Sequence, residues 1–276
     1  MSTPGFDLKA ELELRRGIVE YGRMMDAKGW IAANDGNLSA RLDSSRVLST
    51  PAGVSKGRML PEDLVVVDMA GRKLAGAREC SSEIGMHLAV YRMRPDVHAV
   101  VHAHPPVATG HAAAGRALNL AVLPEMIVML GCVPLADYGL PGTPELLRPM
   151  LPLIPDHDAI LMANHGAVAF GRDLQEAFFR METVEHGARI SLVAELLGGP
   201  KILPRAEVAK LIESRARYGV PTRASAQANC PVAAGESLIE AKSPDRFWVS
   251  REELIAIVDE ALKRLSIRET PAAITE

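Results

Sequence analysis

The chain of 276 residues has few aromatic residues, and neither sign of charge is in large excess. Aromatic side chains make up only 4%, which argues against the stacking platforms that bind single-stranded nucleic acid. Lysine and arginine number 31 against 34 aspartates and glutamates, so the net charge of −3 predicts neither nucleic acid nor an anionic membrane as a partner. No run approaches the roughly 20 apolar residues of a membrane span, and no signal peptide opens the chain. We therefore expect a soluble, cytoplasmic protein.

Cysteine is also scarce. The three cysteines, Cys80, Cys132 and Cys230, are widely separated and include no Cys-X-X-Cys pair. This spacing predicts neither a disulfide framework nor a cysteine-ligated metal. We expect them to be small apolar core residues. Hydrophobic residues, in contrast, make up 48% of the chain, which is enough for a sizeable core.

Helical and strand-like periodicities alternate along the first 219 residues. The expected helices cover 6–28, 82–93, 107–114, 143–151, 174–197 and 204–218. The expected strands cover 37–42, 46–50, 64–68, 72–74, 97–104, 133–136, 159–163 and 167–170. Tight turns join several neighbouring strands as hairpins, so the pattern predicts an α/β protein with a mainly antiparallel sheet.

The periodicity disappears over residues 220–247, where proline, alanine, serine and glycine dominate. Ser250 and Glu253 then form a capping box before an apolar stripe, which predicts a terminal helix. The sequence thus predicts a compact domain over 1–219, followed by an irregular arm and a helix over 220–276.

Three of the eight histidines have a spacing that suits a metal site. His102 and His104 lie two residues apart on an expected strand, and a period of two puts both imidazoles on one face. His165 lies in the connection between two later strands. Three histidines leave a coordination position open, as in catalytic zinc sites. Surface exposure or packing in the core would also explain a His-X-His pair.

Glu83 follows Ser81 and Ser82 at the start of an expected helix. A glutamate at this place can simply stabilise the helix dipole, or it can be a general acid/base or a metal ligand. The hydroxyls and the free N–H groups of the same helix start suit a phosphate. The turns at Gly36–Asn37 and Gly53 could add donors for an anion, although both are also common turn sequences.

Six segments together resemble the class II aldolase and adducin family, and in particular its L-fuculose-phosphate aldolase branch. They occur in the family's order within residues 8–219, namely NDGNLSAR (34–41), TPAGVSKG (50–57), SSEIGMH (81–87), VVHAHPP (100–106), PLADYG (134–139) and NHGAVAFG (164–171). The resemblance implies a three-layer α/β/α sandwich on a mainly antiparallel sheet, assembled as a homotetramer.

The resemblance also implies a site and a reaction. His102, His104 and His165 correspond to the metal ligands, with Zn²⁺ the usual ion and Mn²⁺ or another divalent ion possible. Glu83 corresponds to a catalytic carboxylate that also binds the resting metal. Tyr218 resembles a tyrosine that reaches an active site across a subunit boundary. The implied phosphate cradle consists of Gly36, Asn37, Gly53, Ser81 and Ser82. The expected reaction is reversible cleavage of a ketose 1-phosphate, such as L-fuculose 1-phosphate, into dihydroxyacetone phosphate and an aldehyde.

Three residues depart from the family pattern or add to it. Ala52 replaces a Ser or Thr and removes one hydroxyl from the implied phosphate pocket. Glu125 stands about where the fuculose-phosphate enzyme has a tyrosine, so we expect it to face the distal end of the substrate. Lys56 could restore positive charge near the phosphate, although an exposed lysine is the simpler interpretation.

Three other functions are open to this family. A sugar-phosphate 4-epimerase shares the three histidines but carries aspartate at the position of Glu83. A metal-dependent decarboxylase of the same fold would tolerate the altered phosphate pocket and Glu125. A non-catalytic, adducin-like binding module would have lost the histidines.

Overall fold

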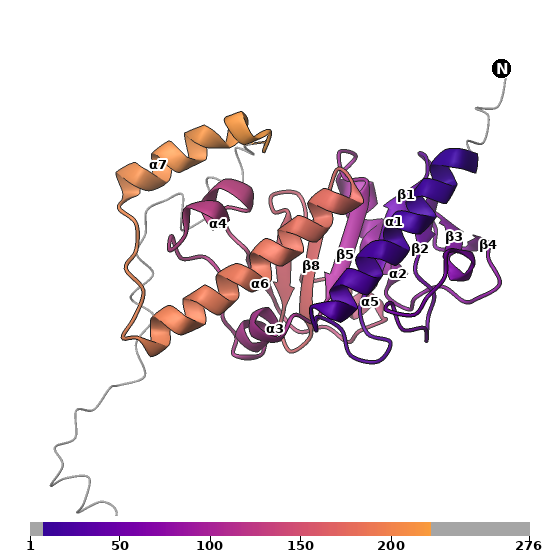
Figure 1. Ribbon diagram of the computed structural model, residues 1–276, viewed down its shortest axis with the longest axis horizontal. Coiled ribbons are helices and arrows are strands. Elements are labelled where there is room, and N and C mark those ends of the chain that lie inside the picture. The colour runs from indigo at the N-terminus through magenta and orange to yellow at the C-terminus, as the bar shows by residue number, and fades with distance from the viewer. Residues whose placement is uncertain (1–7, 222–276) are drawn as a thin grey trace, which may run out of the picture. The chain divides into compact units, whose positions relative to one another are not determined.

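An eight-stranded sheet organises the computed structural model, which describes residues 8–221 (Figure 1). The strands are β1 (Asn37–Arg41), β2 (Arg46–Ser49), β3 (Val65–Asp68), β4 (Lys73–Ala75), β5 (Ala99–Ala103), β6 (Leu135–Ala136), β7 (Ala159–Met162) and β8 (Gly166–Gly171). Their order across the sheet is β4-β3-β2-β1-β5-β8-β7-β6. Within this part of the chain only β6 and β7 pair in parallel, which confirms the mainly antiparallel sheet.

Helices cover both faces of the sheet. They are α1 (Leu8–Ala27), α2 (Ile84–Met93), α3 (Pro106–Ala113), α4 (Pro124–Met129), α5 (Pro144–Leu147), α6 (Leu174–Leu196) and α7 (Arg205–Ser214), with 3-10 turns η1 (Pro61–Asp63) and η2 (Arg215–Tyr218). The core on one face joins the strands to α1, α3 and α6, and the core on the other face joins them to α2 and α5. In Figure 1, α1 and α6 lie side by side over the sheet. The three-layer α/β/α sandwich is therefore confirmed.

The alternation of side chains along the central strands decides what each face carries. Leu38 and Ala40 of β1 point into the core under α1, together with Val101 of β5. Asn37 and Ser39 alternate with them and face α2, because successive strand residues point to opposite sides. The face under α2 thus receives polar side chains at its centre.

Several expected elements differ from the observed ones. Of the expected helix 143–151, only the short α5 is helical. The chain after it forms turns, and these turns bury Met150 and Ile154. Helix α4 was not expected, since six residues carry too little periodicity to reveal it. The expected strand 133–136 shortens to β6, and the helix 204–218 divides into α7 and η2.

The cysteine prediction is only partly correct. Cys132 is buried but disulfide-bonded, and Cys80 is a half-buried free thiol. Cys230 and the expected helix beyond Ser250 lie outside the described residues, so the division at residue 219 stays a prediction. Over residues 8–221, none of the helices combines the length and the apolar character needed to cross a membrane.

Candidate metal and active site

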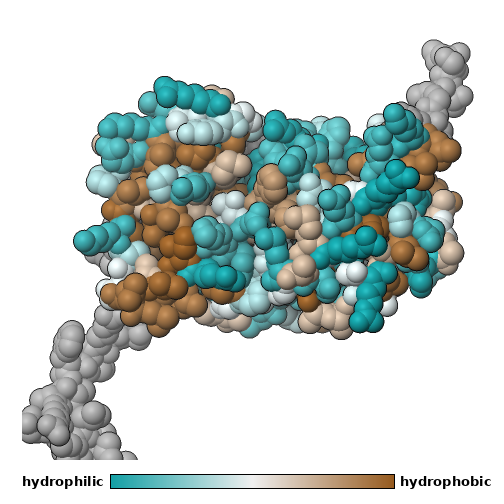
Figure 2. All heavy atoms as spheres, in the orientation of Figure 1, coloured by the Kyte–Doolittle hydropathy of each residue, from teal (hydrophilic) through white to brown (hydrophobic). Residues whose placement is uncertain are grey.

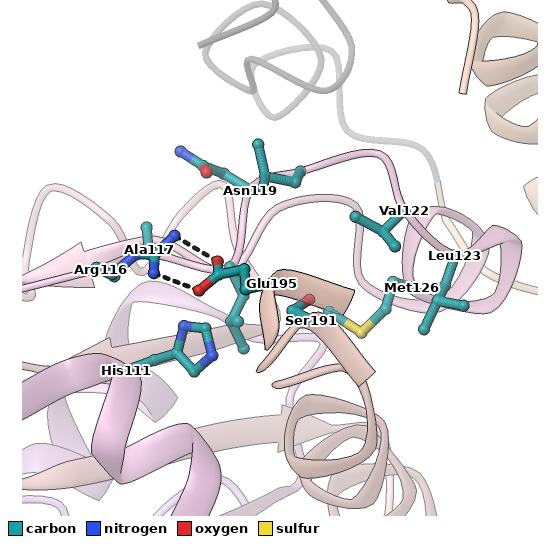
Figure 3. A pocket seen from close by; sticks show the side chains of 11 residues that line it. His111, Arg116, Ala117, Asn119, Val122, Leu123, Met126, Ser191 and Glu195 are labelled. Atoms are coloured by element: carbon teal, nitrogen blue, oxygen red, sulfur yellow. Dashed lines mark hydrogen bonds and ion pairs between the residues drawn. The ribbon is translucent and has the colours of Figure 1, made fainter. Parts of the chain in front are cut away.

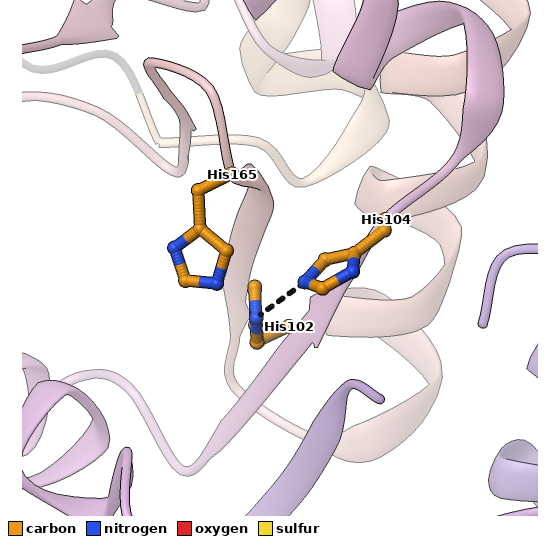
Figure 4. A group of neighbouring side chains, drawn as sticks. All are labelled: His102, His104 and His165. Carbon is orange, nitrogen blue, oxygen red and sulfur yellow. Dashed lines mark hydrogen bonds between the residues drawn. The ribbon is translucent and has the colours of Figure 1, made fainter. Parts of the chain in front are cut away.

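Three histidines from two distant segments converge at one end of the sheet (Figure 4). His102 lies in β5, His104 follows that strand, and His165 lies in the turn between β7 and β8. Their ring centroids are 4.8–5.1 Å apart, and one nitrogen of each lies within 4.8 Å of the others. The three rings therefore surround a common point, as ligands of one ion would.

A glycine allows this convergence. A Cβ on Gly166 would lie 2.6 Å from both the Ala103 carbonyl oxygen and His104 Cδ2. The turn that carries His165 can thus approach the end of β5 only because Gly166 has no side chain. Asn164 in the same turn has a φ of 54°, a left-handed conformation that asparagine tolerates better than most residues.

The hydrogen bond of His102 fixes which nitrogen faces the cluster. Its Nδ1 donates to the Ala167 carbonyl at 2.9 Å, so Nε2 is the nitrogen turned toward His104 and Glu83. This Nε2 lies 3.3 Å from Nε2 of His104. A ligating histidine commonly anchors its other nitrogen on a carbonyl in this way. Burial lowers the pKa of His104 to about 4, with a further contribution from His102 and His165, so its ring is neutral and able to bind a cation.

Glu83 completes the cluster from the start of α2. Its Oε2 lies 3.3 Å from His102 Nε2, and its Oε1 lies 3.2 Å from His165 Nε2. Asn37 Nδ2 donates to the same Oε2 at 2.8 Å. Burial alone would raise the pKa of Glu83, but the contacts with the two histidines and Asn37 hold it well below its usual range. Three imidazoles and a carboxylate are a donor set that fits Zn²⁺ or Mn²⁺.

The residues of the expected phosphate cradle lie on three segments that meet near the start of α2. Gly36, with a φ of +66°, packs against the end of β5, where a Cβ would lie 2.9 Å from the His102 carbonyl oxygen. The loop that carries Gly53 is joined to the chain before α2 by a bridge between Pro51 and Cys80. A Cβ on Gly53 would meet nothing within 4 Å, so open space adjoins this loop.

The two serines lie beside Glu83. Ser81 Oγ accepts from the Glu83 N–H at 3.3 Å. Ser82 and Glu83 line a pocket of about 160 Å³, to which Gly142 and Thr143 contribute from the chain before α5. The structure therefore brings Ser81, Ser82 and Asn37 together around Glu83, and of these three Asn37 bonds its carboxylate.

Glu125 and Tyr218 are not brought to this cluster. Glu125 is exposed in the first turn of α4, and Tyr218 is 67% exposed in η2. These two elements pack on each other, where Arg215 Nη1 donates to the Ile127 carbonyl at 3.1 Å. Within residues 8–221, neither side chain forms a hydrogen bond or ion pair with Glu83 or the histidines.

Lys56 corrects a prediction from the sequence, since it is 2% exposed rather than on the surface. Its stem packs under α1 at Gly22, and its Nζ donates to the Asn34 carbonyl in the loop before Asn37. Burial lowers the pKa of Lys56 to about 8, partly offset by Asp35 and Glu83. Asp35 in turn lies 3.5 Å from His104 Nδ1. Nothing in the local sequence distinguishes this lysine from an exposed one.

A second pocket lies between α3, α6 and the chain before α4 (Figure 3). Arg116 and Glu195 form a paired ion bridge at its rim, and His111 is buried below them. Its volume of about 20 Å³ holds a single water molecule. None of the expected site residues lines it.

Comparison with known proteins agrees with the geometry. The family model described as "Class II Aldolase and Adducin N-terminal domain" matches residues 16–192. The solved structure of an L-fuculose 1-phosphate aldolase superposes with a TM-score of 0.68 at 32% identity, covering 73% of this chain and 95% of that one.

Curated relatives with this domain carry different activities. A 5-deoxy-D-ribulose 1-phosphate aldolase from Bacillus thuringiensis is 34% identical, over 74% of this chain and 96% of its own length. A 3-oxo-tetronate 4-phosphate decarboxylase from Haemophilus influenzae is also 34% identical, over 65% and 87%. A methylthioribulose-1-phosphate dehydratase from Methylococcus capsulatus has the same identity over 64% and 92%.

Proposed function

Because the chain belongs to the class II aldolase and adducin family, we propose that it is a metal-dependent carbon–carbon lyase. Its proposed reaction is reversible cleavage of a ketose 1-phosphate, such as L-fuculose 1-phosphate, into dihydroxyacetone phosphate and an aldehyde. The observation that carries this proposal is the buried, ionised carboxylate of Glu83, which contacts both His102 and His165. A carboxylate held at a metal site can move a proton on a carbon atom beside a carbonyl.

His102, His104 and His165 would hold the ion, with Glu83 as a further ligand at rest. We propose Zn²⁺, since three neutral imidazoles with an open position are its usual catalytic donor set. A bound divalent ion supplies Lewis-acid polarisation of the carbonyl and hydroxyl oxygens of the substrate.

The protein's own groups would then move protons and orient the substrate. In cleavage, the C4 hydroxyl loses its proton, the C3–C4 bond breaks, and its electron pair passes to C3. The carboxyl of Glu83 gives a proton to C3 to complete dihydroxyacetone phosphate, and it removes that proton in the condensation direction. Tyr218 of a neighbouring subunit is the proposed group that exchanges the hydroxyl proton.

The phosphate would bind among Gly36, Asn37, Gly53, Ser81 and Ser82. Small residues and hydroxyls in these loops leave backbone N–H groups accessible to an anion. Glu125 is proposed to act on the distal end of the substrate in a neighbouring active site, because it is exposed and directs no contact to its own histidines.

The second candidate is decarboxylation of a carboxylated sugar phosphate, and it is favoured by the relative from Haemophilus influenzae. Epimerisation is disfavoured because residue 83 is glutamate rather than aspartate. A non-catalytic, adducin-like role is disfavoured because all three histidines are present and converge.

Product analysis separates these functions. Zinc-loaded protein is incubated with L-fuculose 1-phosphate, 5-deoxy-D-ribulose 1-phosphate and 3-oxo-tetronate 4-phosphate in turn. The proposal predicts dihydroxyacetone phosphate from at least one of the two ketose 1-phosphates and no carbon dioxide from the third compound. Carbon dioxide release alone would replace the aldolase proposal with the decarboxylase.

The homotetramer and the cytoplasmic location also stay proposals. A tetramer is supported by the apolar side chains that gather over one end of α6 in Figure 2. Leu196 and Leu197 at this end are 78% and 82% exposed, and Leu192 and Val193 are 40% and 49% exposed. Contiguous apolar side chains of this kind are typical of contacts with another chain.

A further inference from the structure

A row of buried polar side chains lies behind Glu83, between α2 and β1. His87 and Tyr91 follow Glu83 at intervals of four residues, so all three lie on one side of the helix. Asn37 and Ser39 are two apart on β1 and face that side. His87, Ser39 and Tyr91 are 1%, 0% and 2% exposed, so water cannot replace the partners they provide for one another.

Four hydrogen bonds connect this row. Asn37 Nδ2 lies 2.8 Å from Glu83 Oε2, and Asn37 Oδ1 lies 2.5 Å from His87 Nε2. On the other side of the ring, His87 Nδ1 lies 2.6 Å from Ser39 Oγ. Ser39 Oγ lies 2.8 Å from the hydroxyl oxygen of Tyr91.

The direction of every hydrogen in this row follows from its end at Glu83. The Glu83 carboxylate can only accept, so Asn37 must present its NH2 group to it and its oxygen to His87. An amide oxygen also only accepts, so the proton of His87 must be on Nε2. Nδ1 of the neutral ring then accepts from the Ser39 hydroxyl.

The Ser39–Tyr91 pair at the other end of the row has the same direction. Ser39 has a single hydroxyl hydrogen and donates it to His87 Nδ1, so the Tyr91 hydroxyl donates to Ser39 Oγ. Burial lowers the pKa of His87 to about 3, and the nearby His102 contributes, so the ring stays neutral over the working pH range. All donors therefore point from Tyr91 toward Glu83.

We propose that His87 is a positioning residue, which holds the NH2 group of Asn37 toward Glu83. Ser39 and Tyr91 fix the tautomer that this task requires. If Asn37 turned over, its oxygen would face the carboxylate and its NH2 group would face an N–H, so two repulsive contacts would replace two hydrogen bonds. The role in catalysis rests on the proposed function, whereas the tautomer does not.

The tautomer is tested without substrate. Protein labelled with ¹⁵N at histidine and loaded with zinc is examined by two-bond ¹H–¹⁵N NMR, with His87→Gln used to assign the signals. We expect a pyrrole-like Nε2 and a pyridine-like Nδ1 for His87 from pH 6 to 8. A proton on Nδ1, or an imidazolium in this range, would overturn the proposal.

The positioning role is tested with two variants that differ in one donor. His87→Met removes the hydrogen bond to Asn37, whereas the amide of His87→Gln can still donate to Asn37 Oδ1. Loss of a residue that orients a metal-site group typically costs 10–100-fold in activity. We expect His87→Met to lower kcat by about this factor with KM within about twofold, and His87→Gln to recover most of the loss.

Two controls separate positioning from loss of stability. His111→Met makes the same change at a buried histidine of the second pocket and should leave kcat unchanged. Ser39→Ala keeps the ring but removes its donor, and we expect an intermediate kcat. Wild-type kcat in His87→Met, or equal losses in the Met and Gln variants, would contradict the role. If neither the wild type nor any variant shows aldolase activity, the proposed function fails. The NMR signals of the ring and of the Asn37 NH2 group still decide the hydrogen-bond direction in that case.

Discussion

Replacement of Glu83 by glutamine is the sharpest perturbation that the site offers. Glutamine has the same shape and length, but it is neutral and replaces one acceptor oxygen with a donor. In the native protein both oxygens are within 3.3 Å of an imidazole Nε2, and one also accepts from Asn37. The variant keeps the packing of the site and removes the group that we propose moves the proton at C3.

The expected loss follows from that role. General acid–base catalysis typically contributes 10²–10⁴-fold, so kcat should fall by about this factor, or roughly 2.7–5.4 kcal/mol in activation free energy. Stability should change little, because a lost charge-assisted hydrogen bond is offset by removal of a buried charge. We expect the free energy of unfolding to change by about 1 kcal/mol or less.

Proton exchange measures the step directly and needs no knowledge of the aldehyde. Zinc-loaded protein is placed in D₂O with dihydroxyacetone phosphate, and loss of one C3 proton is followed by NMR. Wild type should exchange this proton and Glu83→Gln should not, while zinc content stays near one ion per chain. Glu79→Gln makes the same chemical change on the exposed side of the loop before α2 and serves as the control. Exchange by Glu83→Gln within tenfold of wild type would refute the proposed role.

Three further predictions follow from the same cluster. Gly166→Ala should destabilise the fold by roughly 1–3 kcal/mol and weaken zinc binding, because the new methyl overlaps the Ala103 carbonyl and His104; thermal unfolding and metal content measure both. His104→Ala should lower zinc affinity by more than the 10–100-fold typical of residues that only orient ligands, and metal analysis that finds full retention would discard this ligand. The pKa of Lys56, lowered to about 8, means that the unfolded chain binds a proton that the folded protein has released between about pH 8 and 10.5. The free energy of unfolding of wild type should therefore rise with pH through this window relative to Lys56→Met. Denaturant titrations at a series of pH values measure both, and the same dependence on pH in the two proteins would contradict the prediction.

Local patterns in the sequence predict the sheet well, because strand alternation and hairpin turns depend on residues that are close together in the chain. Apolar alternation and the turns at 43–45 and 69–71 place the first hairpins. The spacing of His102 and His104 puts both rings at the end of β5. The role of Gly166 could not be found in this way, since it depends on how closely two strands approach in space.

The residues around Glu83 show the same limit. His87 and Tyr91 repeat at helical spacing after Glu83, but their partners are on a strand some fifty residues earlier in the chain. The sequence around Lys56 is that of a surface lysine, and its burial depends on packing against α1, which is distant in the chain. Glu125 and Tyr218 remain predictions, since within residues 8–221 they pack away from the histidines and their proposed roles require a neighbouring subunit.

The most direct test of the central claim is the release of dihydroxyacetone phosphate from L-fuculose 1-phosphate or 5-deoxy-D-ribulose 1-phosphate. It is measured with zinc-loaded protein, after a chelator, and again after zinc is restored. The proposed function predicts release that stops with the chelator and returns with the metal. A protein that holds one zinc ion per chain and releases no dihydroxyacetone phosphate from either substrate would contradict it.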